Sequence, residues 1–304
     1  HCTVLTPNTM TSMQTEDEAK SDAELIRQAE EHFSVQQHIC AARCLRKVKD
    51  QSLLTPLHRR ILELADMASS MLDQVSGNSH DSWVKQSEHH GHRDTQIFYK
   101  VLPDNQIAIR IETPIQRSLV CPLISVCIEA DLFYTWVPRF TFPIRIGLFE
   151  SKKIKDVARG HFIATVKVDF PFPLCRRECF EHIFAVDSIE EHQAIIFKAD
   201  GLNTGSYLEI DVPEPERNYI RLDLDAGFTF GPCPADHPCL QHSKHHYDEP
   251  LVLVSVVQCI NAHVAGVPLS WVNFFTRTVL GRMWGNLLQV AEDVRDGKRP
   301  EHKA

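Results

Sequence analysis

The sequence predicts an α+β protein in which a curved antiparallel sheet grips one long C-terminal helix, preceded by an N-terminal helical hairpin. Three observations lead to this fold class. Hydrophobic residues alternate with period two in three segments before a helical stretch and in six segments after it. Strands that follow one another without helical crossovers favour an antiparallel sheet. The chain then ends in an apolar helix, which can cover the hydrophobic face of such a sheet.

The composition fits a folded chain. Hydrophobic residues make up 43% of the 304 residues, which is sufficient for a full core. The chain has 32 basic and 40 acidic residues and a formal net charge of −8, so we expect no nucleic-acid binding, which needs a basic field. Ten cysteines are spread through predicted helices and strands, which predicts a reducing, cytoplasmic location rather than a disulfide scaffold.

The N-terminal part predicts two regions. Residues 1–20 are polar and predict a disordered lead-in. Residues 21–76 predict a helical hairpin, in which Ser21 can cap the first helix and Thr55 with Pro56 can start the second. The hairpin resembles a single tetratricopeptide-type unit, which cannot bury its own apolar face. We expect it to extend the main domain or to bind a protein partner.

All predicted strands fall within a third region, residues 82–297. Alternation is clearest around Ile109, which shares one face of its strand with Ile107 and Ile111. The predicted strands cover residues 83–88, 95–101, 106–112, 152–157, 161–170, 178–187, 193–200, 217–226 and 251–260. Between the third and the fourth strand, residues 117–138 predict two short helices.

The last predicted helix runs from Pro268 to Val290 and is apolar on nearly every side. It is not expected to span a membrane, because Arg277 and Arg282 lie in its middle and an arginine near a bilayer centre costs at least about 2.5 kcal/mol. Its main apolar stripe contains Val272, Phe275, Val279, Met283 and Val290. The helix therefore lies either in a packed core or across an apolar cavity.

Four motifs, in this order, resemble those of the START family, the steroidogenic-acute-regulatory-related lipid-transfer domains. They are "IETPIQRSLVCPLISVCIEADLFYTWVP" with Glu129, Tyr134 and Trp136, "VDFPFPLCRREC" with Pro171, Pro173, Arg177 and Glu178, "NYIRLDLDAGFTFGP" with Arg221, and "GVPLSWVNFFTR". The resemblance covers about Trp83 to Val294.

The resemblance implies a helix-grip fold around one internal tunnel that shields a lipid from water. Each lipid CH₂ gains about 0.8 kcal/mol on burial, so the tunnel must be long and apolar. We expect its lining to include Ile109, Trp136, Val166, Phe184, Leu222, Val256, Val272, Phe275, Val279 and Met283. Arg177, Glu178 and Arg221 are expected to be structural motif residues.

The resemblance also implies a function and its partners. We expect a protein that is not an enzyme and needs no cofactor, binds one lipid for transfer or sensing, and touches membrane surfaces transiently. Sterol-binding members resemble one another in carrying an acid and an arginine inside the pocket. Here the corresponding strand offers Glu181 and His182 but no further arginine.

Two alternatives stay open. One is an enzyme of the cyclase or hydrolase type that uses the same cavity, and the other is an adaptor that binds protein through its N-terminal helices. A separate loop brings together Cys233, His237, Cys239 and His242, whose residue types suit zinc. Their spacing, C-x3-H-x-C-x2-H, is not that of a standard zinc knuckle, so we expect a solvated insertion without metal.

Overall fold

The computed structural model describes residues 20–76, 83–90, 93–103, 106–142, 145–203, 205–207, 210–261, 263 and 274–299. Contacts between residues divide the chain into two compact units, residues 1–66 and 67–304. Among the described helices, none is long and apolar enough to cross a membrane.

The first unit is helical. It contains α1 (Asp22–Ser34), α2 (His38–Arg46), the 3-10 turn η1 (Gln51–Leu53) and the first part of α3 (Pro56–Ser76). Ser21 caps α1 by accepting the Glu24 amide N–H over 3.3 Å. The single helix expected before residue 50 is broken instead, because Gln36 adopts a left-handed φ of 67° and the chain turns back there. One buried cluster of this unit contains Leu25, Ala29, Ala41, Leu45, Val48, Leu54 and Ile61.

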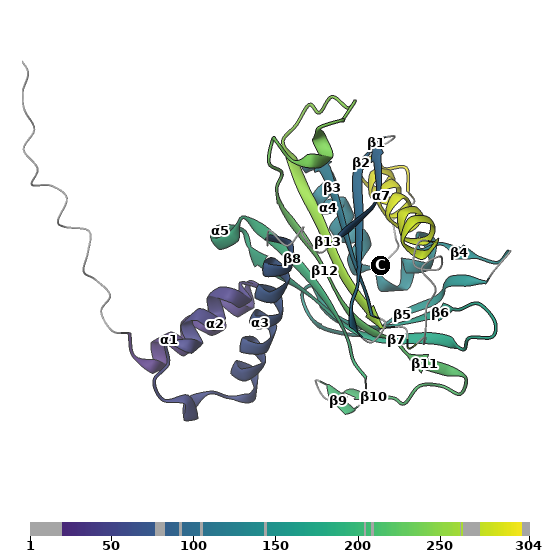
Figure 1. The fold of residues 1–304 in the computed structure, drawn as a ribbon. Helices are drawn as coiled ribbons and strands as arrows, with labels where there is room; N and C mark the ends of the chain where they lie inside the picture. Colours follow the sequence, from purple (N-terminus) through teal and green to yellow (C-terminus); the bar gives the residue numbers. More distant parts are fainter. Residues whose placement is uncertain are drawn as a thin grey trace, which may run out of the picture. The chain divides into compact units, whose positions relative to one another are not determined.

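The second unit is built on an eleven-stranded sheet (Figure 1). Its strands are β1 (Val84–His90), β2 (Asp94–Val101), β3 (Ile107–Gln116), β4 (Arg139–Phe140), β5 (Ile146–Ala158), β6 (His161–Asp169), β7 (Arg176–Ser188), β8 (Ala194–Gly201), β11 (Tyr219–Arg221), β12 (Asp223–Pro232) and β13 (Leu251–Asn261). Their order is β1-β2-β3-β13-β12-β8-β7-β6-β5-β4, and β11 pairs with β7. Among the described pairs only β11 with β7 is parallel, so the predicted strand 217–226 is in fact two strands.

The C-terminal helix packs on one face of this sheet (Figure 1). Its described part contains a π-helical turn, η7 (Phe275–Leu280), and continues as α7 (Gly281–Arg295). The helix α4 (Val120–Ile128) and the 3-10 helix η5 (Ala130–Thr135) precede β4, as the sequence predicted. Apolar residues of α7 and α4 form one buried cluster with residues of β3 and β13. The predicted α+β class, with a helix held by an antiparallel sheet, is confirmed.

The opposite, outer face of the sheet contacts the C-terminal part of α3, which belongs to the second unit. At Gly227 on β12, an added Cβ would lie 2.5 Å from the Met71 sulfur and 2.9 Å from the Phe197 carbonyl oxygen, so the close approach requires glycine. Arg110 on β3 donates from Nη2 to the Val75 carbonyl over 3.0 Å. The sheet is therefore buried on both faces in its middle.

Candidate functional site

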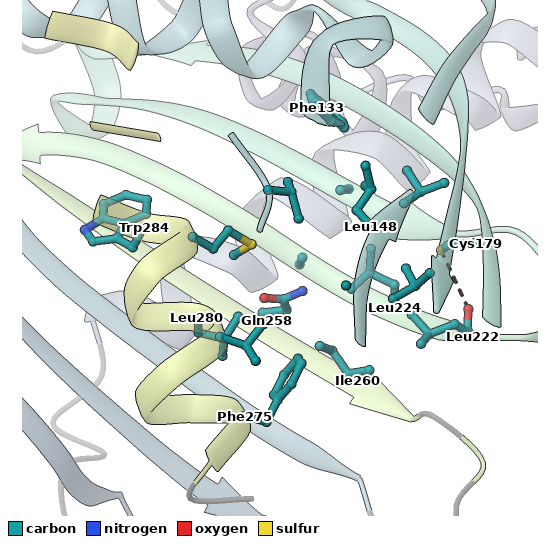
Figure 2. A pocket seen from close by; sticks show the side chains of 18 of the residues that line it. Phe133, Leu148, Cys179, Leu222, Leu224, Gln258, Ile260, Phe275, Leu280 and Trp284 are labelled. Carbon is teal, nitrogen blue, oxygen red and sulfur yellow. Dashed lines mark hydrogen bonds between the residues drawn. The ribbon is translucent and has the colours of Figure 1, made fainter. Parts of the chain in front are cut away.

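An apolar cavity of about 610 Å³ lies between the C-terminal helix and the sheet. Figure 2 shows Phe275, Leu280 and Trp284 on the helix side, and Gln258 and Ile260 on the sheet opposite them. This volume falls within the roughly 300–1,000 Å³ that is typical of small-molecule sites. Because the lining is almost entirely hydrocarbon, the cavity suits an apolar ligand.

Small side chains make room on the sheet side. One row of cross-strand neighbours runs from Gln258 on β13 through Ala226 on β12 and Ala199 on β8 to Ile183 on β7. All four residues line the cavity. Two adjacent members of the row are alanines. Because their side chains are short, the cavity is deeper over the middle of the sheet than over the larger side chains beside them.

The π-helical turn supplies the helix side of the cavity. Phe275, Val279 and Leu280 come from η7, and Met283 follows in the first turn of α7. π-helical turns are rare and occur often at functional sites. Gly281 directly follows the turn, and among the described residues a Cβ added there would meet only Ile97 at 3.7 Å, an ordinary contact. Close packing therefore does not explain this glycine.

Most residues predicted for the tunnel lie on the cavity. Seven of the ten predicted residues border it, namely Trp136, Val166, Leu222, Val256, Phe275, Val279 and Met283. They come from the loop after η5, from strand β6, from the segment before β12, from β13 and from the C-terminal helix. The structure thus brings together side chains that are up to 147 positions apart in the sequence, namely those of Trp136 and Met283.

Three predicted tunnel residues do not line the cavity as described. Val272 lies outside the described residues. Ile109 points to the helix side of the sheet but is buried in the packed cluster, while its neighbours Ile107 and Ile111 border the cavity. The prediction that Phe184 lines the tunnel is wrong, because its side chain lies on the outer face of β7.

The side chains of β7 explain the placement of Phe184. Cys179, Glu181 and Ile183 border the cavity, so the alternating residues between and after them point to the outer face. There Phe184 stacks on His182 with ring centroids 4.9 Å apart and an interplanar angle of 17°. Phe184 is therefore a packing residue of the outer face.

Glu181 is the acidic residue on the cavity lining. Its side chain is almost completely buried, and burial raises the pKa of its carboxyl group to about 7, although a hydrogen bond from the Cys179 thiol opposes part of this rise. Near neutral pH, a substantial fraction of the carboxyl group is thus protonated and can both donate and accept a hydrogen bond. Gln258 is a second polar group on the same lining.

Lys198 also borders the cavity, but its ammonium group points away from it. The residue pairs with Phe184 across β7 and β8, which places its side chain on the outer face. Its Nζ forms an ion pair with Asp225 and lies 3.9 Å from Asp200. Among the described lining residues, none therefore presents a cationic group to the cavity interior.

The predicted motif residues support β7 and β11. Glu178 lies 3.4 Å from Nη1 of Arg221, its cross-strand neighbour. Arg177 instead places its guanidinium 4.8 Å from the centroid of the Phe170 ring and donates to the Cys175 carbonyl. The basic partner of Glu178 is thus Arg221, and Arg177 holds the turn before β7.

Two phenylalanines project from loops at one end of the cavity. Phe170, Pro171 and Leu174, in the turn between β6 and β7, line the cavity, whereas Phe172 in the same turn is 96% exposed. Phe142, which follows β4, is 87% exposed.

Three arginines lie close to these loops. Arg139, Arg145 and Arg176 each form an ion pair with Asp169, at 2.8, 2.8 and 3.1 Å. Three cations share a single buried carboxylate, so these four side chains together carry an excess of two positive charges, although the chain as a whole is negative. We call the two loops with these arginines the rim of the cavity.

Some lining residues were not predicted, although a signal was present. Gln258 follows Val256 by two positions in an alternating strand, so the same alternation that predicted Val256 also places Gln258 inward. From the sequence, Glu181 stands out only because its strand lacks the further arginine of the sterol-binding START domains. Its inward direction could not be read from alternation, because both faces of β7 are buried and both mix apolar with polar residues.

Comparison with known proteins gives structural matches only. No protein-family model matches the chain, and no curated protein sequence matches it. The human StAR-related lipid transfer protein 5 is similar in structure with a TM-score of 0.54 and 12% sequence identity, over 77% of this chain and 96% of that one. Human STARD10 is similar with a TM-score of 0.53 and 10% identity, over 76% of this chain and 80% of that one. The chain therefore has a START-like helix-grip fold.

Proposed function

We propose that this protein binds one lipid molecule in the cavity and carries it or reports its presence, without catalysing a reaction. The observation that carries the proposal is the apolar cavity of about 610 Å³ enclosed by η7, α7 and the sheet. Binding of an acyl chain or a fused-ring lipid there is favoured by about 25 cal/mol for each Å² of apolar surface that leaves water. The likeness to a lipid transfer protein adds support at the level of the fold.

The polar lining suggests which lipid head group is bound. A buried phosphate requires a cation or several donors, and the described lining residues present no cationic group to the interior. A protonated carboxyl at Glu181 and an amide at Gln258 match a hydroxyl or another uncharged polar group. We therefore propose a neutral lipid with a small polar group as the ligand.

The rim supports transient contact with a membrane. Phe172 and Phe142 can enter the headgroup region, and the excess positive charge around Asp169 attracts anionic lipids. This contact would place the cavity next to the bilayer from which a lipid is taken. Eight described cysteines, among them Cys179 and Cys239, are free thiols, which supports a reducing, intracellular compartment as the proposed location.

Native mass spectrometry of the purified chain, followed by lipid extraction, tests the proposal directly. We expect one lipid per chain, and titration with fluorescent analogues should saturate for an uncharged alcohol-bearing lipid more tightly than for phosphatidylcholine. Saturation by none of the lipids, with no lipid in the native spectrum, would rule out the lipid-binding function. Tighter binding of phosphatidylcholine would rule out only the proposed head-group class.

A further inference from the structure

A polar site lies on the outer face of the sheet, away from the lipid cavity. Four cross-strand neighbours form a row there: Glu88 on β1, Gln96 on β2, Glu112 on β3 and Ser255 on β13. Glu112 is only 2% exposed. A buried carboxylate needs partners, so the groups that surround it show what the site can hold.

The loop between β12 and β13 covers Glu112 with metal-ligating side chains. His237 and Cys239 approach Glu112 such that one ligand atom of each of the three residues lies within 4.8 Å of the others. One of these contacts joins His237 Nε2 and Glu112 Oε2 at 3.5 Å. Cys239 is fully buried, and its thiol donates to the Glu112 carbonyl oxygen at 3.5 Å.

These distances are close to those of a metal site. Ligand atoms on a tetrahedral zinc ion lie about 3.3–3.8 Å from one another, given bonds of about 2.0–2.3 Å. The three side chains therefore need to close by no more than about 1.5 Å, which side-chain rotation provides. The loop spacing alone predicts no metal, but that prediction does not include Glu112, which the sheet contributes.

We propose that Glu112, His237 and Cys239 bind a zinc-class divalent ion, with Cys233 as the fourth ligand. Cys233 follows the end of β12 in the same loop and lies outside the three-residue cluster, so it must move toward the ion to bind it. The charges also match. Arg110 Nε already donates to Glu112 Oε1 over 2.7 Å, so two thiolates remain to balance the two charges of the ion.

The remaining contacts indicate how the site is arranged. Arg110 holds one carboxylate oxygen and leaves Oε2 for the ion, as residues behind metal ligands commonly do. His237 Nδ1 accepts the Cys239 amide N–H at 3.3 Å. Binding through Nε2 puts the imidazole proton on Nδ1, so this long contact opens when the ring turns toward the ion.

The proposed role of the ion is structural. The connection from Pro232 to Leu251 contains a single short element in the described chain, the 3-10 turn η6 (Pro238–Leu240). A zinc ion that joins this loop to β3 fixes a long connection that has little regular structure of its own. Binding free energy of such ions contributes directly to folding.

Metal analysis of the full chain tests the site independently of lipid binding. The protein is purified without added metal, stripped with a chelator, and reloaded with zinc or cobalt(II). We expect one metal ion per chain, a cobalt spectrum with a thiolate-to-metal charge-transfer band, and a lower melting temperature after stripping. Absence of stoichiometric metal and of the charge-transfer band after reloading would overturn the proposal.

Variants separate this site from other ligands. Glu112→Gln, Cys239→Ser and Cys233→Ser should each lower the bound metal to well below one ion per chain. His246→Ala changes a fully exposed histidine of the same loop, and Cys259→Ser changes a cysteine on β13, so both should keep it. Retention of metal by Glu112→Gln and Cys239→Ser overturns the assignment. Cys239→Ser changes a fully buried side chain and can unfold the chain, which would also remove the metal. Glu112→Gln preserves the shape of the side chain, so its metal content decides whether Glu112 is a ligand.

Discussion

Trp284 on α7 donates its indole N–H to the hydroxyl oxygen of Thr113 on β3 over 2.8 Å, and both side chains are buried. Thr113 in turn donates to the Thr95 hydroxyl on β2 over 3.0 Å. On the other side of the helix, Asn286 donates to the Trp136 carbonyl over 3.0 Å. Thr113 thus links α7 to the sheet, and the Trp136 carbonyl links it to the segment after η5. Residues of η7 and of the first turn of α7 line the cavity.

Replacing Thr113 with valine should destabilise the protein by about 1–3 kcal/mol. The change keeps the shape but leaves the buried Trp284 N–H without its acceptor. Chemical denaturation measures the effect. Thr113→Ser keeps the hydroxyl group and should lose less stability, so equal stability of Thr113→Val and the parent would contradict the anchoring role.

Two glycines in the second unit should respond to alanine in opposite directions. Gly285→Ala on α7 should stabilise by about 1 kcal/mol, because no atom of the described residues lies within 4 Å of an added Cβ and alanine favours the helix. Gly227→Ala on β12 should destabilise, because the same Cβ meets Met71 and the Phe197 carbonyl oxygen below 3.0 Å. Thermal melting of the pair measures both effects. A Gly285→Ala protein that melts lower than the parent would show a packing role for this glycine.

Much of the fold could be predicted from the sequence, because the hydrophobic period changes with each type of element. The strand order along the chain, the two short helices before Pro138 and the final apolar helix all follow from that period. The break between α1 and α2 did not follow, since glutamine at position 36 gives no turn signal and only its backbone conformation reveals the bend.

The cavity could be predicted only in part, for a physical reason. Alternation assigns a face correctly where one face of a strand is apolar, and Val256 on β13 is such a case. It fails on β7, where Phe184 is buried against His182 on the outer face and Glu181 faces the cavity. The cavity also depends on which residues are small, and the register that aligns Ala199 with Ala226 is set by pairing between distant segments.

Glu181 should make stability depend on pH in a specific window. An unfolded glutamate has a pKa near 4.5, and the folded pKa is raised to about 7, so the folded state binds the proton more tightly between these values. The free energy of unfolding should therefore fall as pH rises from about 4.5 to about 7, by on the order of 3 kcal/mol in total. Glu181→Gln, which cannot ionise, should lack this fall.

Denaturation of the lipid-free protein at pH 5 and pH 8 measures this dependence. Carboxyl groups with lowered pKa values, such as Glu88 with a pKa of about 2, change stability only below their usual range and do not interfere. An equal loss of stability between the two pH values in the parent and in Glu181→Gln would refute the assignment.

Phe172→Asp should weaken binding to vesicles that contain anionic lipid, and it should slow lipid transfer between such vesicles. The side chain is 96% exposed, so its removal should leave melting and lipid content unchanged. Vesicle sedimentation measures the binding. Ile154→Asp serves as a matched control, because Ile154 is an exposed apolar residue on β5 away from the turn. Equal loss with both variants would indicate general charge repulsion instead of a docking site.

Met283→Trp tests whether the C-terminal helix faces a ligand or a packed core. Met283 borders the cavity together with Val279 and Phe275, so the larger ring can enter the open space. Lipid binding should then be lost, while the melting temperature stays within a few degrees. In a packed core the same change would cost about 1–3 kcal/mol through overpacking. Val290 lies on the same helix, packed against the core and outside the cavity lining, so Val290→Trp shows the effect of overpacking a core position. A Met283→Trp protein that binds lipid as well as the parent, or that melts as low as Val290→Trp, would contradict a ligand-facing helix.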